Sequence, residues 1–142
     1  SPTLKNLTVV NNDYGIECYS GNPNISNCIL WDNTEIDLAG CRATFSCIEQ
    51  GHEGTGNISS NPLFANANED DFHLQSERGR YWPMYDIWVL DKVTSPCIDR
   101  GNPDDDCSNE REPNGGMINM GAYGGTSQAS LSTSGSSAND KS

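Results

Sequence analysis

The 142-residue chain is long enough for one domain, yet only 34% of its residues are hydrophobic and 8% are aromatic, which is few for a compact globular core. Its formal charge of −12 leaves no basic face for nucleic acid or an anionic membrane, so neither is expected as a partner. No apolar run approaches the ~18 residues that span a bilayer, and frequent turn residues predict many short strands rather than helices.

A repeat begins with the first apolar segment. Leu4–Asn12 aligns with Ile25–Asn33 at an offset of 21, so that apolar residues fall on apolar residues and Asn falls on Asn. We expect Asn12 and Asn33 to stack at a turn, where the amide side chains bond between layers and tolerate left-handed backbone. A repeat near this length, built from short strands, predicts a solenoid of parallel strands.

The repeat continues along two further alignments. Asn27–Ile29 aligns with Ser46–Ile48 at an offset of 19, which predicts that Cys28 stacks on Cys47. A second arc aligns Gly15–Glu17 with Glu35–Asp37 at an offset of 20, with Asn57–Ser59 as a third member. This arc predicts an inward ladder of three isoleucines, which are Ile16, Ile36 and Ile58.

The later segments carry a family resemblance. They are Asn57–Phe64 (NISSNPLF), Asp71–Leu74 (DFHL), Trp88–Gly101 (WVLDKVTSPCIDRG) and Asn114–Gly125 (NGGMINMGAYGG). With the repeat, they resemble right-handed parallel β-helix proteins of the pectate-lyase-like superfamily, in particular the closing section of secreted bacterial β-helix proteins of planctomycete type. The resemblance implies an all-β, right-handed parallel β-helix with about three coils and an irregular C-terminal cap.

Three parts are predicted along the chain. Residues 1–64 form the coils, continuing upstream or stacked on a partner, residues 65–125 form the capping section, and residues 126–142 form a Ser/Thr/Gly-rich tail or linker. An open N-terminal rung and an ordered tail would suit head-to-tail assembly of identical chains into a filament. The apolar residues expected to close the bottom of the coil are Phe64, Phe72, Leu74, Trp88, Val89, Leu90 and Ile98.

Exposed aromatic residues are the first candidate site. Trp31 lies just outside the inward positions of the repeat, and Tyr81, Trp82 and Tyr85 cluster before the closing motif. Aromatic rings stack on sugar rings and also anchor protein partners. These four residues are therefore candidates for contact with a polysaccharide or a partner, with packing inside the cap as the alternative.

Acidic residues are the second candidate site. Asp104, Asp105 and Asp106, with Asp99 nearby, form the densest group of oxygen ligands, which is the chemistry that Ca²⁺ prefers. The spacing matches no EF-hand, so a solvated acidic loop is the alternative. Glu17 and Asp37 align between coils and could place two carboxylates together, but no complete catalytic group follows from the sequence, and no catalytic residue is assigned.

The six cysteines contain no closely spaced pair of the kind that zinc sites use, and their even number fits disulfides in an oxidising compartment. Cys28 and Cys47 are expected to be buried thiols. The sequence therefore predicts an extracellular or cell-surface scaffold that is structural or adhesive, with polysaccharide contact and self-assembly as further possibilities. The alternative is the C-terminal part of a polysaccharide-degrading lyase or hydrolase whose active site lies in upstream coils.

Overall fold

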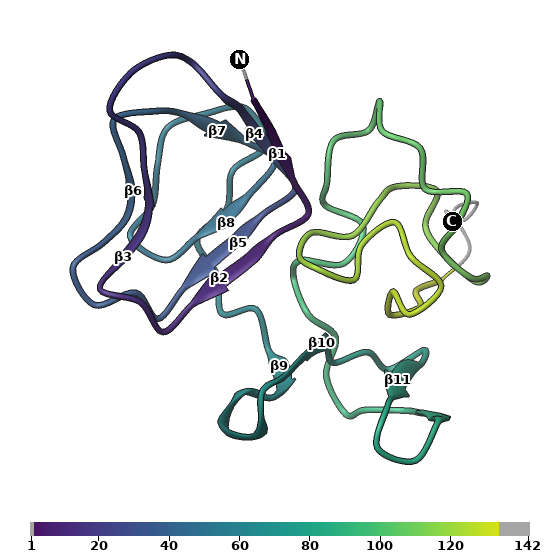
Figure 1. Ribbon diagram of the computed structural model, residues 1–142. Coiled ribbons are helices and arrows are strands. Elements are labelled where there is room, and N and C mark those ends of the chain that lie inside the picture. The colour runs from purple at the N-terminus through teal and green to yellow at the C-terminus, as the bar shows by residue number, and fades with distance from the viewer. Residues whose placement is uncertain (1, 134–142) are drawn as a thin grey trace.

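The structure is a computed structural model that describes residues 2–133, and it is all-β, as predicted (Figure 1). Within that range there is no α-helix, and the one helical turn is a 3-10 segment, η1 (Ala67–Glu69). No helix in residues 2–133 has the length and apolar character that crossing a membrane requires. The strands are β1 (Thr3–Lys5), β2 (Thr8–Val10), β3 (Tyr14–Glu17), β4 (Asn24–Ser26), β5 (Ile29–Trp31), β6 (Ile36–Ala39), β7 (Ala43–Thr44), β8 (Cys47–Ile48), β9 (Phe64–Asn66), β10 (Asp71–Leu74), β11 (Arg80–Trp82) and β12 (Ile87–Val89).

The first eight strands form three parallel sheets, which we call the strand stack (residues 3–48). The sheet orders are β1-β4-β7, β2-β5-β8 and β3-β6, so each successive pass of the chain adds a strand beside the equivalent strand of the pass before. The stack occupies the purple to blue part of Figure 1. An isolated parallel bridge between Cys47 and Ile58 extends the second sheet by one more layer.

Left-handed backbone turns the chain between strands at equivalent points of successive passes. Asn6 and Asn27 have φ values of 54° and 59° between the first and second strands, and Phe45 takes the same place in the third pass with φ 48°. Asparagine tolerates this conformation because its short polar side chain bonds locally. Asn27 Nδ2 donates to Asn6 Oδ1 at 3.3 Å, so the two corners are joined through their side chains.

The predicted register is confirmed for the first and second strands of the first two passes. Leu4 pairs with Ile25 and Val9 with Leu30, as the offset of 21 requires. The stacking of Asn12 on Asn33 is also confirmed, since the Asn12 backbone N–H and Nδ2 both donate to Asn33 Oδ1, at 3.1 and 3.3 Å.

The predicted stacking of Cys28 on Cys47 is wrong by one residue. Ile29 pairs with Cys47 and Leu30 with Ile48, so the offset is 18 instead of 19. A shift of one residue sends a side chain to the opposite face of a strand. Cys28 therefore lies inside the stack, whereas Cys47 lies on the outer face of its sheet, although both side chains are buried, as predicted.

The second arc is also misaligned in the sequence prediction. Ile16 pairs with Leu38 and Glu17 with Ala39, because the connection from β5 to β6 is one residue longer than the connection from β2 to β3. Ile16, Ile36 and Ile58 therefore form no ladder, and Glu17 and Asp37 are not opposite each other. Asp37 is buried, where its carboxylate accepts from Asn33 Nδ2 at 3.0 Å and from the Gln50 backbone N–H at 3.0 Å.

Two apolar clusters hold the fold. The first core cluster fills the inside of the stack and contains Ile25, Cys28, Leu30, Leu38, Cys41, Ala43 and Ile48. The second core cluster lies between the outer face of β5 and β8 and the later part of the chain, and contains Ile29, Cys47, Leu74, Cys97, Ile98 and Met120. The strands at this boundary are buried on both faces, so their sequence is a continuous apolar run rather than an alternation.

The C-terminal section (residues 64–133) therefore lies along the flank of the stack, beside β2, β5 and β8 (Figure 1). Leu74 and Ile98 pack there, whereas Leu90, also expected to close the coil, is exposed. Residues 126–133, expected to be linker, pack onto this section, and the Leu131 backbone N–H donates to the Gly79 carbonyl at 2.8 Å. The rest of the predicted tail, residues 134–142, lies outside the described residues.

Candidate functional site

The β11–β12 hairpin carries three of the four predicted aromatic residues. The strands are antiparallel, with Tyr81 opposite Trp88 and Trp82 opposite Ile87. Asp86 turns the chain with φ 51°, and its Oδ1 accepts from the Tyr81 hydroxyl at 2.6 Å. Tyr85, in the turn, meets the Trp82 ring edge-on with ring centroids 4.7 Å apart.

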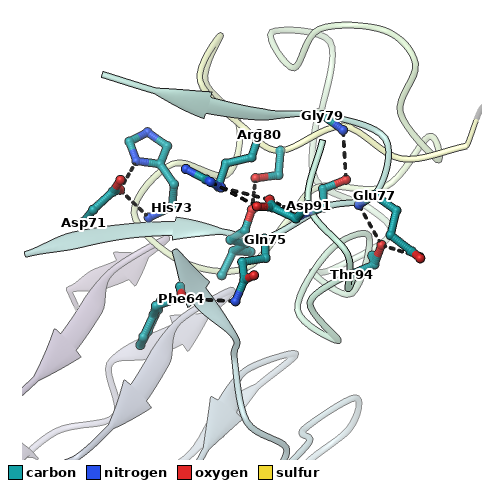
Figure 2. Close-up of polar contacts among 12 residues, drawn as sticks. Phe64, Asp71, His73, Gln75, Glu77, Gly79, Arg80, Asp91 and Thr94 are labelled. Atoms are coloured by element: carbon teal, nitrogen blue, oxygen red, sulfur yellow. Dashed lines mark hydrogen bonds and ion pairs between the residues drawn. The ribbon is translucent and has the colours of Figure 1, made fainter. Parts of the chain in front are cut away.

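A partly buried ion pair fixes the base of this hairpin, as Figure 2 shows. Arg80 Nε and Nη2 donate to the two carboxylate oxygens of Asp91 at 2.9 and 3.0 Å. Asp91 Oδ2 also accepts from the Ser76 backbone N–H at 2.9 Å. This two-pronged geometry is directional, so it fixes the orientation of β11 as well as its position.

A cleft lies between the hairpin and the β9–β10 turn. It has a volume of about 280 Å³. We call it the Trp82 cleft, and its lining residues are Asn66, Glu69, Asp70, Asp71, Trp82, Pro83, Met84 and Tyr123. Asp70 has φ 60° at the end of η1, and this tight turn brings three consecutive carboxylates to one edge of the cleft.

Buried contacts hold the inner wall of the Trp82 cleft. The His73 and Tyr123 rings are stacked with centroids 3.6 Å apart. His73 Nδ1 lies 2.6 Å from Asp71 Oδ1, and His73 Nε2 lies 2.9 Å from Gln128 Oε1 (Figure 2 shows the Asp71 contact). Burial, followed by the nearby Asp71 carboxylate, raises the pKa of Tyr123, which keeps its phenol neutral.

This lining combines aromatic faces with hydrogen-bond acceptors. Trp82 and Tyr123 offer flat apolar surfaces, while the Asn66 amide and the three carboxylates can bind hydroxyl groups. Concave sites of this kind, apolar with a few convergent polar groups, are typical of small-molecule binding. Among residues 2–133, no Lys or Arg lines the cleft, so its charge disfavours an anionic ligand.

The structure separates the predicted aromatic residues. Trp82 lines the cleft and Tyr85 packs on it, whereas Tyr81 lies between Trp88 and His73, with ring centroids 5.5 and 5.9 Å away. Trp31 is half-buried against the second core cluster and does not contribute to the cleft.

The predicted calcium ligands have separate partners. Asp105 bonds Asn27 Nδ2 at 2.7 Å and Lys5 Nζ at 3.1 Å, while Asp106 accepts from the Ser108 backbone N–H at 2.9 Å. Asp99 is part-buried beside Gly115, and burial raises the pKa of its carboxyl. Asp104 donates its backbone N–H to Asn102. Across residues 2–133, no three His, Cys, Asp or Glu side chains gather as a metal site would require, and the calcium site stays a prediction from the sequence.

Sequence reasoning missed most of the cleft. The sequence contains a second run of three consecutive carboxylates, Glu69–Asp71, as dense as Asp104–Asp106. This run was the signal in the sequence that could have indicated the acidic edge of the cleft. Tyr123 lies in the closing motif about 50 residues further on, and only the packing of His73 against it brings the two segments together.

A family model described as disaggregatase related matches residues 7–101, which is more than half of the chain. The match spans the second to eighth strands of the stack and continues through the hairpin that carries Trp82. No curated protein and no solved structure is similar enough to the chain to count as a match.

Proposed function

Taking as the premise that the chain belongs to the disaggregatase-related family, we propose that it is an extracellular, non-catalytic scaffold domain that contacts a glycan through the Trp82 cleft. The architecture we propose is the terminal part of a right-handed parallel β-helix. The single observation that carries the binding function is the Trp82 cleft, where aromatic faces lie beside carboxylate and amide acceptors.

The parallel registers of successive passes support the β-helix. Equivalent strands recur in three sheets, and Asn6 and Asn27 turn the chain at equivalent corners. Parallel strands joined by crossovers are right-handed in nearly all proteins, which favours that hand here. The Cys18–Cys41 disulfide supports an oxidising compartment, and with it an extracellular or cell-surface location.

The lining of the cleft favours neutral sugars or amino sugars as the ligand class. Sugar rings stack on indole faces through their C–H groups, and their hydroxyls or amines would donate to Asn66, Glu69 and Asp70. A uronate would bring its own negative charge to these carboxylates and would be repelled.

Binding of immobilised neutral, amino and acidic glycans by wild type and the Trp82→Ala variant tests this proposal. Loss of the stacking surface is expected to weaken binding about tenfold or more, which corresponds to about 1.4 kcal/mol. Tyr19→Ala is the matched control, since Tyr19 is 90% exposed and lies outside the cleft. Equal binding by wild type and Trp82→Ala, with both variants folded by circular dichroism, would exclude the cleft as the glycan site.

A second candidate is that the chain belongs to a polysaccharide-degrading lyase or hydrolase. The observation that favours it is the family description, disaggregatase related, because the word disaggregatase has the form of an enzyme name. Release of reducing ends or unsaturated sugars from a polysaccharide panel by this chain would replace the scaffold proposal. Asp70→Asn and Glu69→Gln would then identify whether the cleft carboxylates perform the reaction.

Self-assembly is a separate part of the proposal. In the described residues, β1 and β2 are edge strands of their sheets, and β3 pairs only with β6. Free strand edges can pair with another chain. Negative-stain electron microscopy is expected to reveal filaments with a regular repeat, and discrete particles at high concentration would exclude this assembly.

A further inference from the structure

Two free cysteines from distant parts of the chain meet in the second core cluster. Cys47 lies on the outer face of β8, and Cys97 lies in the C-terminal section, 50 residues later. Both side chains are fully buried, with an exposed fraction of 0%. They belong to the same cluster as Ile29 and Met120, at the boundary between the stack and the C-terminal section.

Cys47 and Cys97 are packed into the same buried cluster, close enough for each thiol to shift the pKa of the other. The Cys47 thiol donates to the Ser60 carbonyl at 3.1 Å, which leaves its sulfur free to accept from Cys97. The backbone on both sides is also fixed. The Cys47 N–H donates to the Cys28 carbonyl at 2.8 Å, and the Cys97 carbonyl accepts from Met120 at 3.0 Å.

From this juxtaposition we infer that Cys47 and Cys97 form a second disulfide, which joins the strand stack covalently to the C-terminal section. The oxidant is a disulfide, either a small one such as oxidised glutathione or that of a thiol–disulfide oxidoreductase. The Cys47 thiolate attacks it, a sulfur–sulfur bond of the oxidant breaks, and one thiol leaves. Cys97 then attacks Cys47 Sγ and releases the second thiol, so two cysteines lose two protons and two electrons while one disulfide is reduced to two thiols.

The environment assigns different parts to the two cysteines. The hydrogen bond from Cys97 lowers the pKa of Cys47, while the same contact, followed by burial, raises the pKa of Cys97. Thiolate is the attacking species, so Cys47 reacts first and Cys97 resolves the mixed disulfide. Because both sulfurs are buried in the folded chain, the exchange takes place while the C-terminal section is docking on the stack, when Cys97 already lies beside Cys47 and the oxidant can still reach the two thiols.

The remaining cysteines do not compete for this pairing. Cys18 and Cys41 already form a disulfide. Cys28 lies inside the stack, where its thiol bonds the Ser26 carbonyl at 3.2 Å, and Cys107 is half-buried in the acidic loop. Because Cys47 pairs with Ile29 and not with Cys28, the two thiols lie on opposite faces of the sheet, and only Cys47 faces Cys97.

Peptide mapping of the whole chain tests the pairing directly. The chain is refolded with a mixture of oxidised and reduced glutathione, alkylated in denaturant, and digested with trypsin without reduction. Cleavage separates Cys47 (peptide 43–78) from Cys97 (peptide 93–100), while Cys18, Cys28 and Cys41 remain together in peptide 6–42. The expected product is peptide 43–78 linked to peptide 93–100, two hydrogen atoms lighter than their sum. Separate, alkylated peptides, or a link to peptide 6–42 or 101–111, would overturn the inference.

Thermal unfolding of two alanine variants gives an independent test of the same bond. Cys28→Ala keeps the pair and Cys97→Ala removes it, and each variant loses one fully buried thiol. Reduction breaks the Cys18–Cys41 bond in both variants, whereas it breaks a Cys47–Cys97 bond only in Cys28→Ala. The fall in Tm on reduction should therefore be larger in Cys28→Ala by about 5–10 °C. Equal falls in Tm would contradict a stabilising Cys47–Cys97 bond, and if Cys97→Ala does not fold, the peptide map of wild type and Cys28→Ala still decides.

Discussion

At the scale of single residues, Asn27 joins the two parts of the molecule through both ends of its side-chain amide. Its Oδ1 accepts from the Asn102 backbone N–H at 2.7 Å, and its Nδ2 donates to Asp105 at 2.7 Å and to Asn6 at 3.3 Å. Its side chain thus links the corner of the stack to the acidic loop of the C-terminal section. The loop that the sequence suggested as a calcium site is instead tied to the stack through Asp105.

We predict that Asn27→Ala lowers the free energy of unfolding by about 3 kcal/mol, because partly buried partners lose their hydrogen bonds to this buried side chain and alanine disfavours the left-handed backbone. Urea unfolding measures the change. Asn24→Ala is the control, since Asn24 is exposed, and it should change stability by less than about 0.5 kcal/mol. Equal effects of the two substitutions would contradict a structural role for the Asn27 amide.

Glu110 is a buried carboxylate whose titration opposes folding at neutral pH. Burial raises its pKa, although the Asn119 and Gly125 backbone N–H groups donate to Oε2 at 2.8 and 2.9 Å and partly offset this effect. Its Oε1 is buried and has no hydrogen-bond partner in the part of the chain that the structure describes. A carboxyl group with a raised folded-state pKa binds its proton more tightly when folded, so stability falls as pH rises above the ordinary pKa of 4.5 and levels off above the folded-state value.

We therefore predict that the difference in unfolding free energy between wild type and Glu110→Gln shifts in favour of the variant as pH rises from about 4 to 7. The glutamine cannot ionise, and its carbonyl can still accept from both backbone donors. Urea unfolding at a series of pH values measures this difference. If the unfolding free energies of the two proteins change with pH in parallel, ionisation of Glu110 does not destabilise the fold.

At the scale of elements, β5 is the strand on which both cores depend. Leu30 points into the stack between Val9 and Ile48, while its neighbour Ile29 points outward into the second core cluster. Both side chains are fully buried. The alternation of a strand therefore places one residue in each core, and the two residues are a matched pair for separating the cores experimentally.

We predict that Leu30→Ala and Ile29→Ala each cost about 3 kcal/mol, since each leaves a cavity in a packed cluster. Their local effects should differ. Hydrogen exchange is expected to accelerate mainly at β2, β5 and β8 in Leu30→Ala, and mainly around Cys97 and Met120 in Ile29→Ala. Identical exchange patterns would mean that the stack and the C-terminal section unfold as one unit.

At the scale of the whole molecule, cross-links offset the small size of the cores. The Cys18–Cys41 disulfide joins the ends of β3 and β6 across a sequence separation of 23 residues. We predict that the double variant Cys18→Ser/Cys41→Ser loses about 3 kcal/mol of stability, because the unfolded chain regains the entropy of the open loop. Urea unfolding tests this, with Cys107→Ser as a control. A loss no greater than that of the control would mean that this disulfide does not stabilise the fold.

Part of this fold could be predicted from the sequence, because an apolar repeat with asparagine corners records which residues stack. The pairing of Leu4 with Ile25 and of Asn12 with Asn33 follows from that pattern. The third pass could not be predicted correctly, because its strands have only two residues each and Phe45 occupies a corner that asparagine holds elsewhere. Two-residue strands contain too little pattern to reveal an error of one residue in the alignment. That error placed Cys47 beside Cys28, although Cys47 pairs with Ile29.

The sequence by itself determined the all-β class, the register of the first and second strands in the first two passes, and the cluster of aromatic residues around Trp82. Only the tertiary structure decided which carboxylates line the cleft beside Trp82, which side chains of β5 pack into each core cluster, and which two thiols meet. The physical reason is the separation along the sequence between the residues that meet. A strand pattern is local, whereas the Trp82 cleft and the Cys47–Cys97 contact each join segments about 50 residues apart, whose approach depends on how the C-terminal section packs along the flank of the stack.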